Sequence, residues 1–170
     1  MEAGSTSLTL QVTDLERLLH DMVGKVRGEM EKKKLAFDVR LPGKLPELAV
    51  DKDKIVVALV NLLGNAAKYT PAEGQVRLHV DLSDGALLIH VEDSGIGISP
   101  EEQSHIFDKF FRSGDHRVQD ITGSGLGLSL TSEIVRLHGG RLSVHSELDK
   151  GSRFSVKLPL SRETSRCSNA

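Results

Sequence analysis

The sequence predicts an α+β fold in which a mixed, mostly antiparallel β-sheet packs against three main helices as a two-layer α/β sandwich. Three segments, at about 14–33, 51–70 and 126–138, place apolar residues at helical spacing. Shorter runs alternate apolar and polar residues, as strands with one buried face do. Two of these runs, 76–82 and 86–92, are separated only by a Ser-Asp-Gly turn, which predicts a hairpin and therefore an antiparallel pair.

The N-terminal elements are bounded by cap and turn residues. Residues 8–12 alternate like a short strand, and Thr13 or Asp14 then caps the first helix, which runs to about Lys33. Residues 35–41 alternate again and end at a Pro-Gly turn. We therefore expect a strand on each side of the first helix.

The C-terminal half has equally clear boundaries. The sequence Ser99-Pro100-Glu101-Glu102 has the pattern of a capping box with proline at the first helical position, and it predicts a short helix through Phe107. The pair Gly139-Gly140 ends the third main helix. The runs 141–147 and 153–160 are predicted as the last two strands.

Length and composition describe one globular domain. The chain has 170 residues, of which 38% are hydrophobic and 27% charged; we expect the domain to cover 7–160, with disordered ends at 1–6 and 161–170. The net charge of −2 gives no indication of nucleic acid or of direct membrane contact. The sequence shows no membrane span and no signal peptide, and its single Cys167 excludes an internal disulfide. We expect a cytoplasmic domain.

The second main helix, which Pro71 ends, has two different faces. Asn61 and Asn65 lie four residues apart on a polar side, with Lys68 and Tyr69 one turn further on. Carboxamide oxygens suit a hard cation such as Mg²⁺, and a lysine suits the phosphates that the cation neutralises. A plain surface helix with asparagines facing solvent is the alternative. The adjacent apolar stripe consists of Ile55, Leu59, Leu62, Leu63 and Ala66.

Two glycine-rich segments follow this helix. The first, Asp93-Ser94-Gly95-Ile96-Gly97-Ile98, closes the second hairpin strand with an acid and two spaced glycines, which permit close approach of the backbone. By itself it is also typical of an ordinary strand-ending turn. The second, Gly123-Ser124-Gly125-Leu126-Gly127-Leu128, opens the third helix, whose free N–H groups suit phosphate.

The second glycine segment differs from three common nucleotide motifs. No Gly-Lys-Ser/Thr follows it, which excludes a Walker loop. A polar stretch at 112–122 precedes it where a dinucleotide fingerprint would have a strand. The His-Arg-Asp and Asp-Phe-Gly signatures of protein kinases are missing from the sequence. A phosphate-binding loop of another class remains.

Five motifs in register resemble those of sensor histidine kinases. Asn61-x-x-x-Asn65-Ala66-x-Lys68-Tyr69-Thr70-Pro71 resembles their N box, and the two glycine segments resemble their two glycine boxes. Phe107-Asp108-Lys109-Phe110-Phe111-Arg112 resembles the F box, and Gly151-Ser152-Arg153-Phe154 resembles the closing pattern. The match spans about 7–160, so the chain is identified as a member of the catalytic and ATP-binding domains of these kinases, in the GHKL (Bergerat-fold) superfamily. The resemblance implies the Bergerat sandwich and a site for ATP and Mg²⁺.

The resemblance also implies individual roles. Asn65 would ligate Mg²⁺ with Asn61 in support, and Lys68 would reach the phosphates. Tyr69 would cover the adenine or the ribose. Asp93 would accept a hydrogen bond from the adenine amino group, a contact that discriminates well because a buried carboxylate facing the wrong base edge is costly.

The glycine boxes and the loop between them would complete the site. The polar segment 108–122 is the expected lid, whose local order should depend on nucleotide. Within it Arg112 either contacts the γ-phosphate as a catalytic residue or stays solvated. Phe107, Phe110 and Phe111 are expected mainly to pack against the core and anchor the lid. The remaining residues implied in cofactor binding are Gly95, Gly97, Ile98, Phe107, Gly123, Ser124, Gly125, Leu126, Gly127 and Leu128.

The identity of residue 61 indicates the type of chemistry. Other ATPases that share this fold (gyrase, heat-shock chaperones and mismatch-repair ATPases) have a glutamate four residues before the metal-binding asparagine, and it activates water. Asn61 cannot act as a general base at neutral pH, which favours phosphoryl transfer to histidine. Two alternatives stay open: a true ATPase or serine kinase of the same fold, and a noncatalytic ATP-binding module that serves regulation or dimer contacts.

The phosphoacceptor is expected outside this chain. The resemblance implies a histidine on a separate helical-hairpin dimerisation domain upstream of Met1, and a response regulator as an indirect partner. His20 begins a sequence that only faintly resembles the acceptor box, lacks its proline, and falls in the first helix of the ATP-binding domain. We therefore interpret His20 as a surface residue and expect the isolated domain to hydrolyse ATP slowly if at all.

Overall fold

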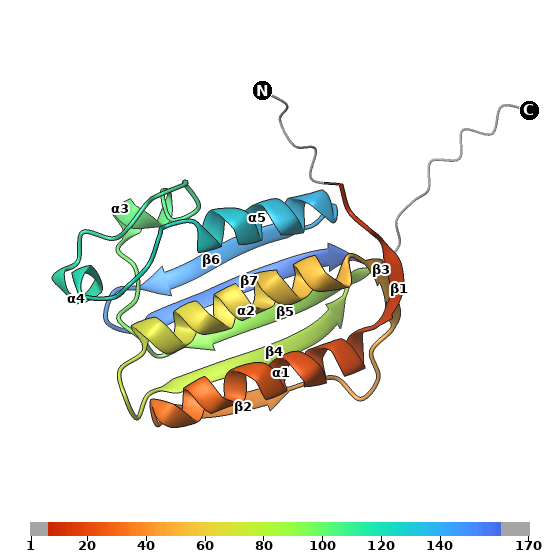
Figure 1. Ribbon diagram of the computed structural model, residues 1–170, viewed down its shortest axis with the longest axis horizontal. Coiled ribbons are helices and arrows are strands. Elements are labelled where there is room, and N and C mark those ends of the chain that lie inside the picture. The colour runs from red at the N-terminus through yellow and green to blue at the C-terminus, as the bar shows by residue number, and fades with distance from the viewer. Residues whose placement is uncertain (1–6, 161–170) are drawn as a thin grey trace, which may run out of the picture.

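A five-stranded sheet forms one layer of the molecule, and three long helices lie side by side on one face of it (Figure 1). The computed structural model describes residues 7–160. Both expected disordered ends, and Cys167, lie outside the described residues. The strands, in their order across the sheet, are β2 (Ala36–Arg40), β4 (Gln75–Ser83), β5 (Ala86–Asp93), β7 (Gly151–Pro159) and β6 (Arg141–Glu147). The helices are α1 (Leu15–Lys32), α2 (Lys52–Tyr69) and α5 (Gly127–Leu137).

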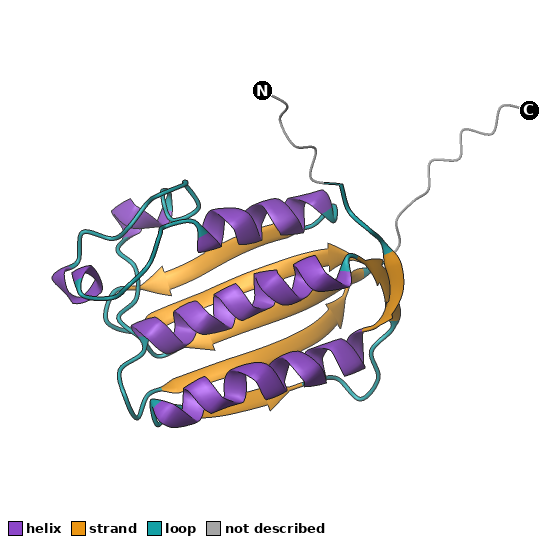
Figure 2. Cartoon of the chain, viewed as in Figure 1, coloured by secondary structure: helices purple, strands orange, loops and turns teal. Residues whose placement is uncertain are grey.

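The sheet is mixed and mostly antiparallel, as predicted. Only β2 and β4 pair in parallel, and the other neighbours are antiparallel. The hairpin β4–β5 turns at Asp84 and Gly85, both with positive φ (50° and 72°), which is the backbone that a two-residue Asp-Gly turn favours. Figure 2 shows the resulting division into one helical layer and one sheet layer.

An aspartate N-cap precedes the first residue of both α1 and α2. The carboxylate of Asp14 accepts from the N–H of Arg17 at 3.1 Å, and the carboxylate of Asp51 accepts from the N–H of Lys54 at 3.3 Å. Asp14 is one of the two caps that the sequence offers for the first helix, and each aspartate satisfies an otherwise unpaired N–H of a first helical turn. The buried His138 at the end of α5 accepts from the N–H of Asp51 at 2.9 Å, which joins the start of α2 to the end of α5.

The core lies between the helices and the inner face of the sheet. α2 lies between α1 and α5 (Figure 1), and its apolar stripe is buried, with Leu62 1% and Leu63 0% exposed. From the sheet, Leu78 and Leu87 are fully buried against the helices. Burying this apolar surface is the main driving force that holds the two layers together.

Two short strands form a second sheet that the sequence prediction placed incompletely. β1 (Gln11–Asp14) pairs antiparallel with β3 (Glu47–Val50). The expected strand at 8–12 is shifted toward α1, and β3 was not expected. Pairing between distant segments decides where both strands form, since Thr13 lies opposite Leu48. Each run alone is too short for its alternation of apolar and polar residues to mark a strand.

The segment after the first glycine box differs from its prediction. The helix α3 (Pro100–Gln103) ends well before Phe107, and Ser99 makes no side-chain cap hydrogen bond, so the predicted capping box is wrong. The carboxylate of Glu102 is used elsewhere, because it accepts from the hydroxyl of Ser113 and the N–H of Gly114. None of the helices in residues 7–160 has the length and hydropathy that crossing a membrane would require.

Candidate functional site

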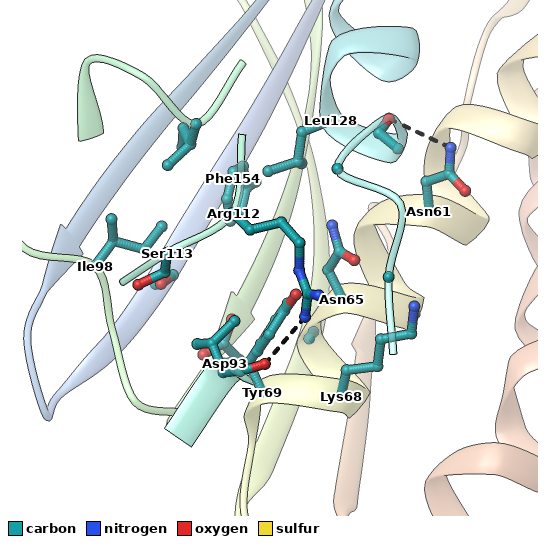
Figure 3. A pocket seen from close by; sticks show the side chains of 18 of the residues that line it. Asn61, Asn65, Lys68, Tyr69, Asp93, Ile98, Arg112, Ser113, Leu128 and Phe154 are labelled. Carbon is teal, nitrogen blue, oxygen red and sulfur yellow. Dashed lines mark hydrogen bonds between the residues drawn. The ribbon is translucent and has the colours of Figure 1, made fainter. Parts of the chain in front are cut away.

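A cavity of about 510 Å³ opens between α2, the first glycine segment, the loop before α5 and the lid (Figure 3). Most of the residues predicted to form a site line this one cavity, although they come from four separate parts of the chain. They are Asn61, Asn65, Lys68, Tyr69, Asp93, Gly97, Ile98, Arg112, Gly123, Ser124, Gly125, Gly127 and Leu128.

Three predicted residues do not line the cavity. Gly95 lies beneath it, where an added Cβ would stand 2.5 Å from the backbone oxygen of Tyr69. Phe107 packs edge-on against Phe154, with ring centroids 6.5 Å apart, and so supports the wall from behind. Leu126 is 38% exposed on the outer surface.

One wall is the polar side of α2. Asn65 and Lys68 face the cavity, and neither side chain has a hydrogen bond or ion pair with another residue in 7–160. Asn61 differs, because its amide donates to the carbonyl of Gly127 at 3.4 Å and to the hydroxyl of Thr131 at 3.5 Å (Figure 3). Asn61 thus connects α2 to the start of α5 and holds the second glycine box beside Asn65.

The opposite wall carries Asp93, the last residue of β5. Its Oδ1 accepts from the N–H of Gly95 at 2.9 Å, and burial raises the pKa of this carboxyl to about 6, although backbone hydrogen bonds from Gly95 and Ser152 oppose the rise. The free energy lost by desolvating the carboxylate exceeds the free energy gained from these two hydrogen bonds. A further donor on a bound molecule would therefore be strongly favoured here.

The glycines are required by protein packing as well as by any ligand. Gly97 has φ 70°, and a Cβ there would collide with the carbonyl of Glu147. Gly125 has φ 74°, and a Cβ there would lie 2.7 Å from the carbonyl carbon of Phe110. The close backbone approach expected at Gly95 and Gly97 therefore occurs within the protein, since their Cβ positions are taken by the neighbouring backbone of Tyr69 and Glu147.

The lid has an internal structure that sequence did not predict. It contains the short helix α4 (His116–Gln119), and Val118 within it is only 5% exposed, although the sequence showed only a polar segment here. Arg112 donates to the carbonyls of Val118, at 3.1 Å, and Ile121. Its guanidinium is thus bound to lid backbone while it lines the cavity. Dependence of lid order on nucleotide stays a prediction.

Two ionic anchors fasten the lid to the body of the domain. Glu102 holds the hydroxyl of Ser113 at 2.8 Å. Arg117 pairs with Asp115 in the lid and with Asp149 in the β6–β7 turn, the latter at 2.7 Å. Hydrogen bonds from Arg117 hold the pKa of Asp115 well below its usual range.

The phenylalanines of the F box separate into two kinds. Phe107 and Phe111 pack against the core, as predicted. Phe110 does not, since it is 72% exposed with a positive φ of 64°. Its N–H donates to the carbonyl of Gly125 at 2.9 Å, which joins its backbone to the second glycine box, and its ring does not line the cavity.

Sequence reasoning missed the contribution of α1. Lys25 and Glu29 on this helix reach the cavity beyond Gly64, where a Cβ would meet no atom within 4 Å. No motif marks them, because only the packing of α1 beside α2 brings them there.

The site suits a magnesium ion bound together with phosphates. No group of three His, Cys, Asp or Glu side chains in residues 7–160 could hold a metal by itself. The free amide of Asn65 would supply one oxygen, and Mg²⁺ in nucleotide sites takes its other ligands from phosphates and water. Lys68 stands one turn away to receive phosphate charge.

Comparison with known proteins assigns the family. A family model described as histidine kinase-, DNA gyrase B-, and HSP90-like ATPase matches residues 50–162. The chain belongs to this family. Within it, the similar proteins are sensor histidine kinases, and the chain is the ATP-binding catalytic domain of this kinase type.

The relatives of this histidine kinase domain are longer proteins. It is 40% identical over 151 residues to the adaptive-response sensory kinase SasA of Synechococcus sp. (strain JA-3-3Ab), covering 88% of this chain and 40% of that protein. It is 38% identical over 163 residues to the sensor histidine kinase TmoS of Ectopseudomonas mendocina, covering 94% and 16%. The chain thus spans less than half the length of these curated relatives.

Solved structures agree with the fold of the histidine kinase domain. Full-length ShkA in complex with AMPPNP superimposes with a TM-score of 0.82 at 29% identity, over 94% of this chain and 33% of that one. The mycobacterial sensor histidine kinase MprB gives 0.75 at 28% identity, over 89% and 97%. The Bergerat-type sandwich predicted from the five motifs is confirmed.

Proposed function

We propose that this domain binds Mg-ATP in the cavity and transfers the γ-phosphoryl group to a histidine on a separate phosphoacceptor domain of the same kinase. A response regulator would receive the group afterwards. The observation that carries the proposal is the arrangement of two free polar side chains, Asn65 and Lys68, opposite a buried carboxylate, Asp93, across one cavity. The nucleotide-bound relative ShkA supports the same ligand class. Because ATP is the donor, we place the reaction in the cytoplasm.

Each wall has a distinct task in this reaction. Asp93 accepts a hydrogen bond from the amino group of adenine, and Tyr69 covers the base or the ribose. Asn65 and Lys68 hold the metal–phosphate end, where the metal would neutralise charge that develops on the phosphoryl oxygens. The acceptor imidazole attacks phosphorus through the lone pair of its unprotonated nitrogen, a P–N bond forms as the P–O bond to ADP breaks, ADP leaves, and the proton on the other ring nitrogen is released to solvent. No protein base is required, because a neutral imidazole is already nucleophilic.

The amide at position 61 opposes efficient hydrolysis. Asn61 is occupied in holding the carbonyl of Gly127 and cannot remove a proton from water at neutral pH. Among the carboxylates that line the cavity, Glu102 is engaged by the lid and Asp93 lies at the far wall. Glu29 of α1 is the remaining carboxylate to test.

The surface beside the cavity supports a protein substrate. Three large apolar side chains are exposed on and beside the second glycine box, with exposed fractions of 72% for Phe110, 38% for Leu126 and 48% for Leu130. Phe110 is tied to Gly125 by its N–H, and Leu130 follows Leu126 by one helical turn. Exposed apolar side chains gathered at the mouth of a site are typical of a protein-binding surface.

The test has two steps. Calorimetric titration of the chain with AMPPNP and ADP, with and without Mg²⁺, should show binding that Asp93→Asn weakens sharply and whose Mg²⁺ dependence Asn65→Ala removes. The phosphoacceptor hairpin of the parent protein is then added in trans with γ-labelled ATP, and acid-labile phosphohistidine is measured.

Three outcomes would contradict the proposal. An unmodified chain that binds no nucleotide would favour a regulatory module without catalysis. Rapid hydrolysis without the hairpin would favour an ATPase, and loss of that hydrolysis in Glu29→Gln would identify its base. Label on serine rather than histidine would favour a serine kinase.

A further inference from the structure

The last turn of α2 ends in carbonyl groups that the helix itself cannot satisfy. Two of them are bound by a side chain from another helix, because Nζ of Lys33 donates to the carbonyl of Ala67 at 2.6 Å and to that of Lys68 at 2.9 Å. The next carbonyl, that of Tyr69, accepts from the N–H of Ile96 in the first glycine box at 3.2 Å. Three successive carbonyls are thus fixed by groups outside the helix.

This last turn of α2 also forms part of the cavity wall. Lys68 and Tyr69 both line the cavity, and their own carbonyls are the ones held by Lys33 and Ile96. Any rotation of this turn would therefore swing both side chains. Lys33 binds this turn from outside the cavity, since it is the C-cap residue of α1 and is absent from the cavity lining.

The chemistry of Lys33 suits this task. A positive charge is stabilised at a helix C-terminus, where the carbonyl dipoles concentrate negative potential. Partial burial disfavours the charged form of the ammonium, and it lowers the pKa of Lys33. Its neighbour Lys32 is exposed and forms no such bonds, so the interaction belongs to one lysine of the basic run rather than to the run as a whole.

We propose that Lys33 is a positioning residue of the nucleotide site: by binding the carbonyls of Ala67 and Lys68 it fixes the turn that aims Lys68 at the phosphates of ATP. The inference rests on the proposed nucleotide binding of the cavity. It predicts a selective defect, in which recognition of the phosphate end weakens and recognition of the adenine end at Asp93 persists.

The experiment compares three variants with the unmodified chain. Lys33→Met keeps the aliphatic stem and removes the ammonium, Lys33→Arg restores a cation with two or more donors, and Lys32→Met is the matched control on the exposed neighbour. Calorimetry gives the Kd of each for AMPPNP with Mg²⁺ and for adenosine, and thermal melting gives Tm. All titrations are made well below the lowest Tm.

The expected result is a split between the two ligands. Lys33→Met should weaken AMPPNP binding roughly tenfold, the order expected for losing hydrogen bonds to a charged group, and adenosine binding by less than about threefold. Lys33→Arg should recover most of the AMPPNP affinity, and Lys32→Met should match the unmodified chain. Amide hydrogen exchange in residues 66–70 should also accelerate in Lys33→Met without any ligand.

Three results would overturn the inference. These are equal loss of AMPPNP and adenosine affinity, which indicates a general structural role; unchanged affinities in Lys33→Met; and unchanged exchange in residues 66–70. An unmodified chain that binds neither ligand would instead overturn the proposed function, and the inference with it.

Discussion

Replacing Asp93 with asparagine should separate the cost of burying a carboxylate from the benefit it brings to nucleotide binding. The free carboxyl has an ordinary pKa of 3.8, and burial raises it to about 6 in the folded chain. At about 1.4 kcal/mol for each pKa unit, ionised Asp93 lowers the stability of the folded state by roughly 3 kcal/mol at neutral pH. The asparagine variant carries no such charge.

The sign of the pH dependence follows from the two pKa values. Below pH 3.8 the carboxyl is protonated in both the folded and the unfolded chain, and it contributes no pH dependence. Between pH 3.8 and about 6 the unfolded chain has lost this proton and the folded chain has kept it, so the free energy of unfolding falls as pH rises. Above pH 6 the difference is constant. Asp93→Asn removes this fall.

The measurement is urea unfolding of both chains between pH 4 and pH 8, with Asp21→Asn on the exposed face of α1 as the matched control. We expect the stability of Asp93→Asn relative to the parent to rise by about 2–3 kcal/mol from pH 4 to pH 7 and then to level off. Any fixed offset from changed hydrogen bonds to Gly95 and Ser152 does not alter this slope.

Nucleotide binding should change in the opposite direction. The parent chain should lose affinity for AMPPNP by up to about tenfold per pH unit below pH 6, because a protonated Asp93 no longer accepts as a carboxylate. Asp93→Asn should bind roughly 10- to 100-fold more weakly at pH 7.5, with little dependence on pH. A relative stability independent of pH, or full nucleotide affinity in the variant, would refute the reasoning.

Three further substitutions test the core, the first glycine box and the lid. Leu63→Ala, at a fully buried position of α2, should lower the free energy of unfolding by about 2–5 kcal/mol in urea titration, and a smaller loss would mean that the core collapses onto the gap. Gly97→Ala should lower Tm and nucleotide affinity together because the new Cβ collides with the backbone that ends β6, whereas Gly43→Ala, with no atom within 4 Å of the added Cβ, should do neither. Arg117→Ala breaks the 2.7 Å pair with Asp149, and it should accelerate amide exchange and proteolysis within 108–122 with little change in Tm; unchanged exchange would show that this anchor does not hold the lid.

The elements that sequence predicted well are those whose determinants are local. The Asp-Gly turn needs positive φ at two adjacent residues, and Asp84 and Gly85 can adopt it wherever they stand. Asp14 caps the first helix through a bond to a residue three positions away. Gly139, with φ 74°, follows His138, the C-cap residue of α5.

The elements that sequence missed depend on partners far along the chain. β3 is a strand because β1 pairs with it, and α4 buries Val118 only because the lid folds back over the cavity. The predicted capping box at Ser99 is wrong because the carboxylate of Glu102 accepts hydrogen bonds from Ser113 and Gly114 in the lid instead of from the start of its own helix. A local pattern cannot reveal a competing partner that is distant in sequence.

The candidate site divides in the same way. Sequence by itself selected the candidate residues: Asn65, Lys68 and Asp93 were chosen from their side-chain type and motif, and the structure places all three around one cavity. It could not determine that Asn61 is bound to α5 or that Lys33 fixes the end of α2.

Those contacts arise only in the tertiary structure. The packing of α1 and α5 on either side of α2 creates them, because hydrogen bonds of 2.6 to 3.5 Å between residues 34 to 70 positions apart exist only when the two layers have formed. The types of side chain in a site can be recognised from short motifs in the sequence. Its geometry is decided by helices and strands that meet in space, where burial of the common core sets their positions to within a hydrogen bond.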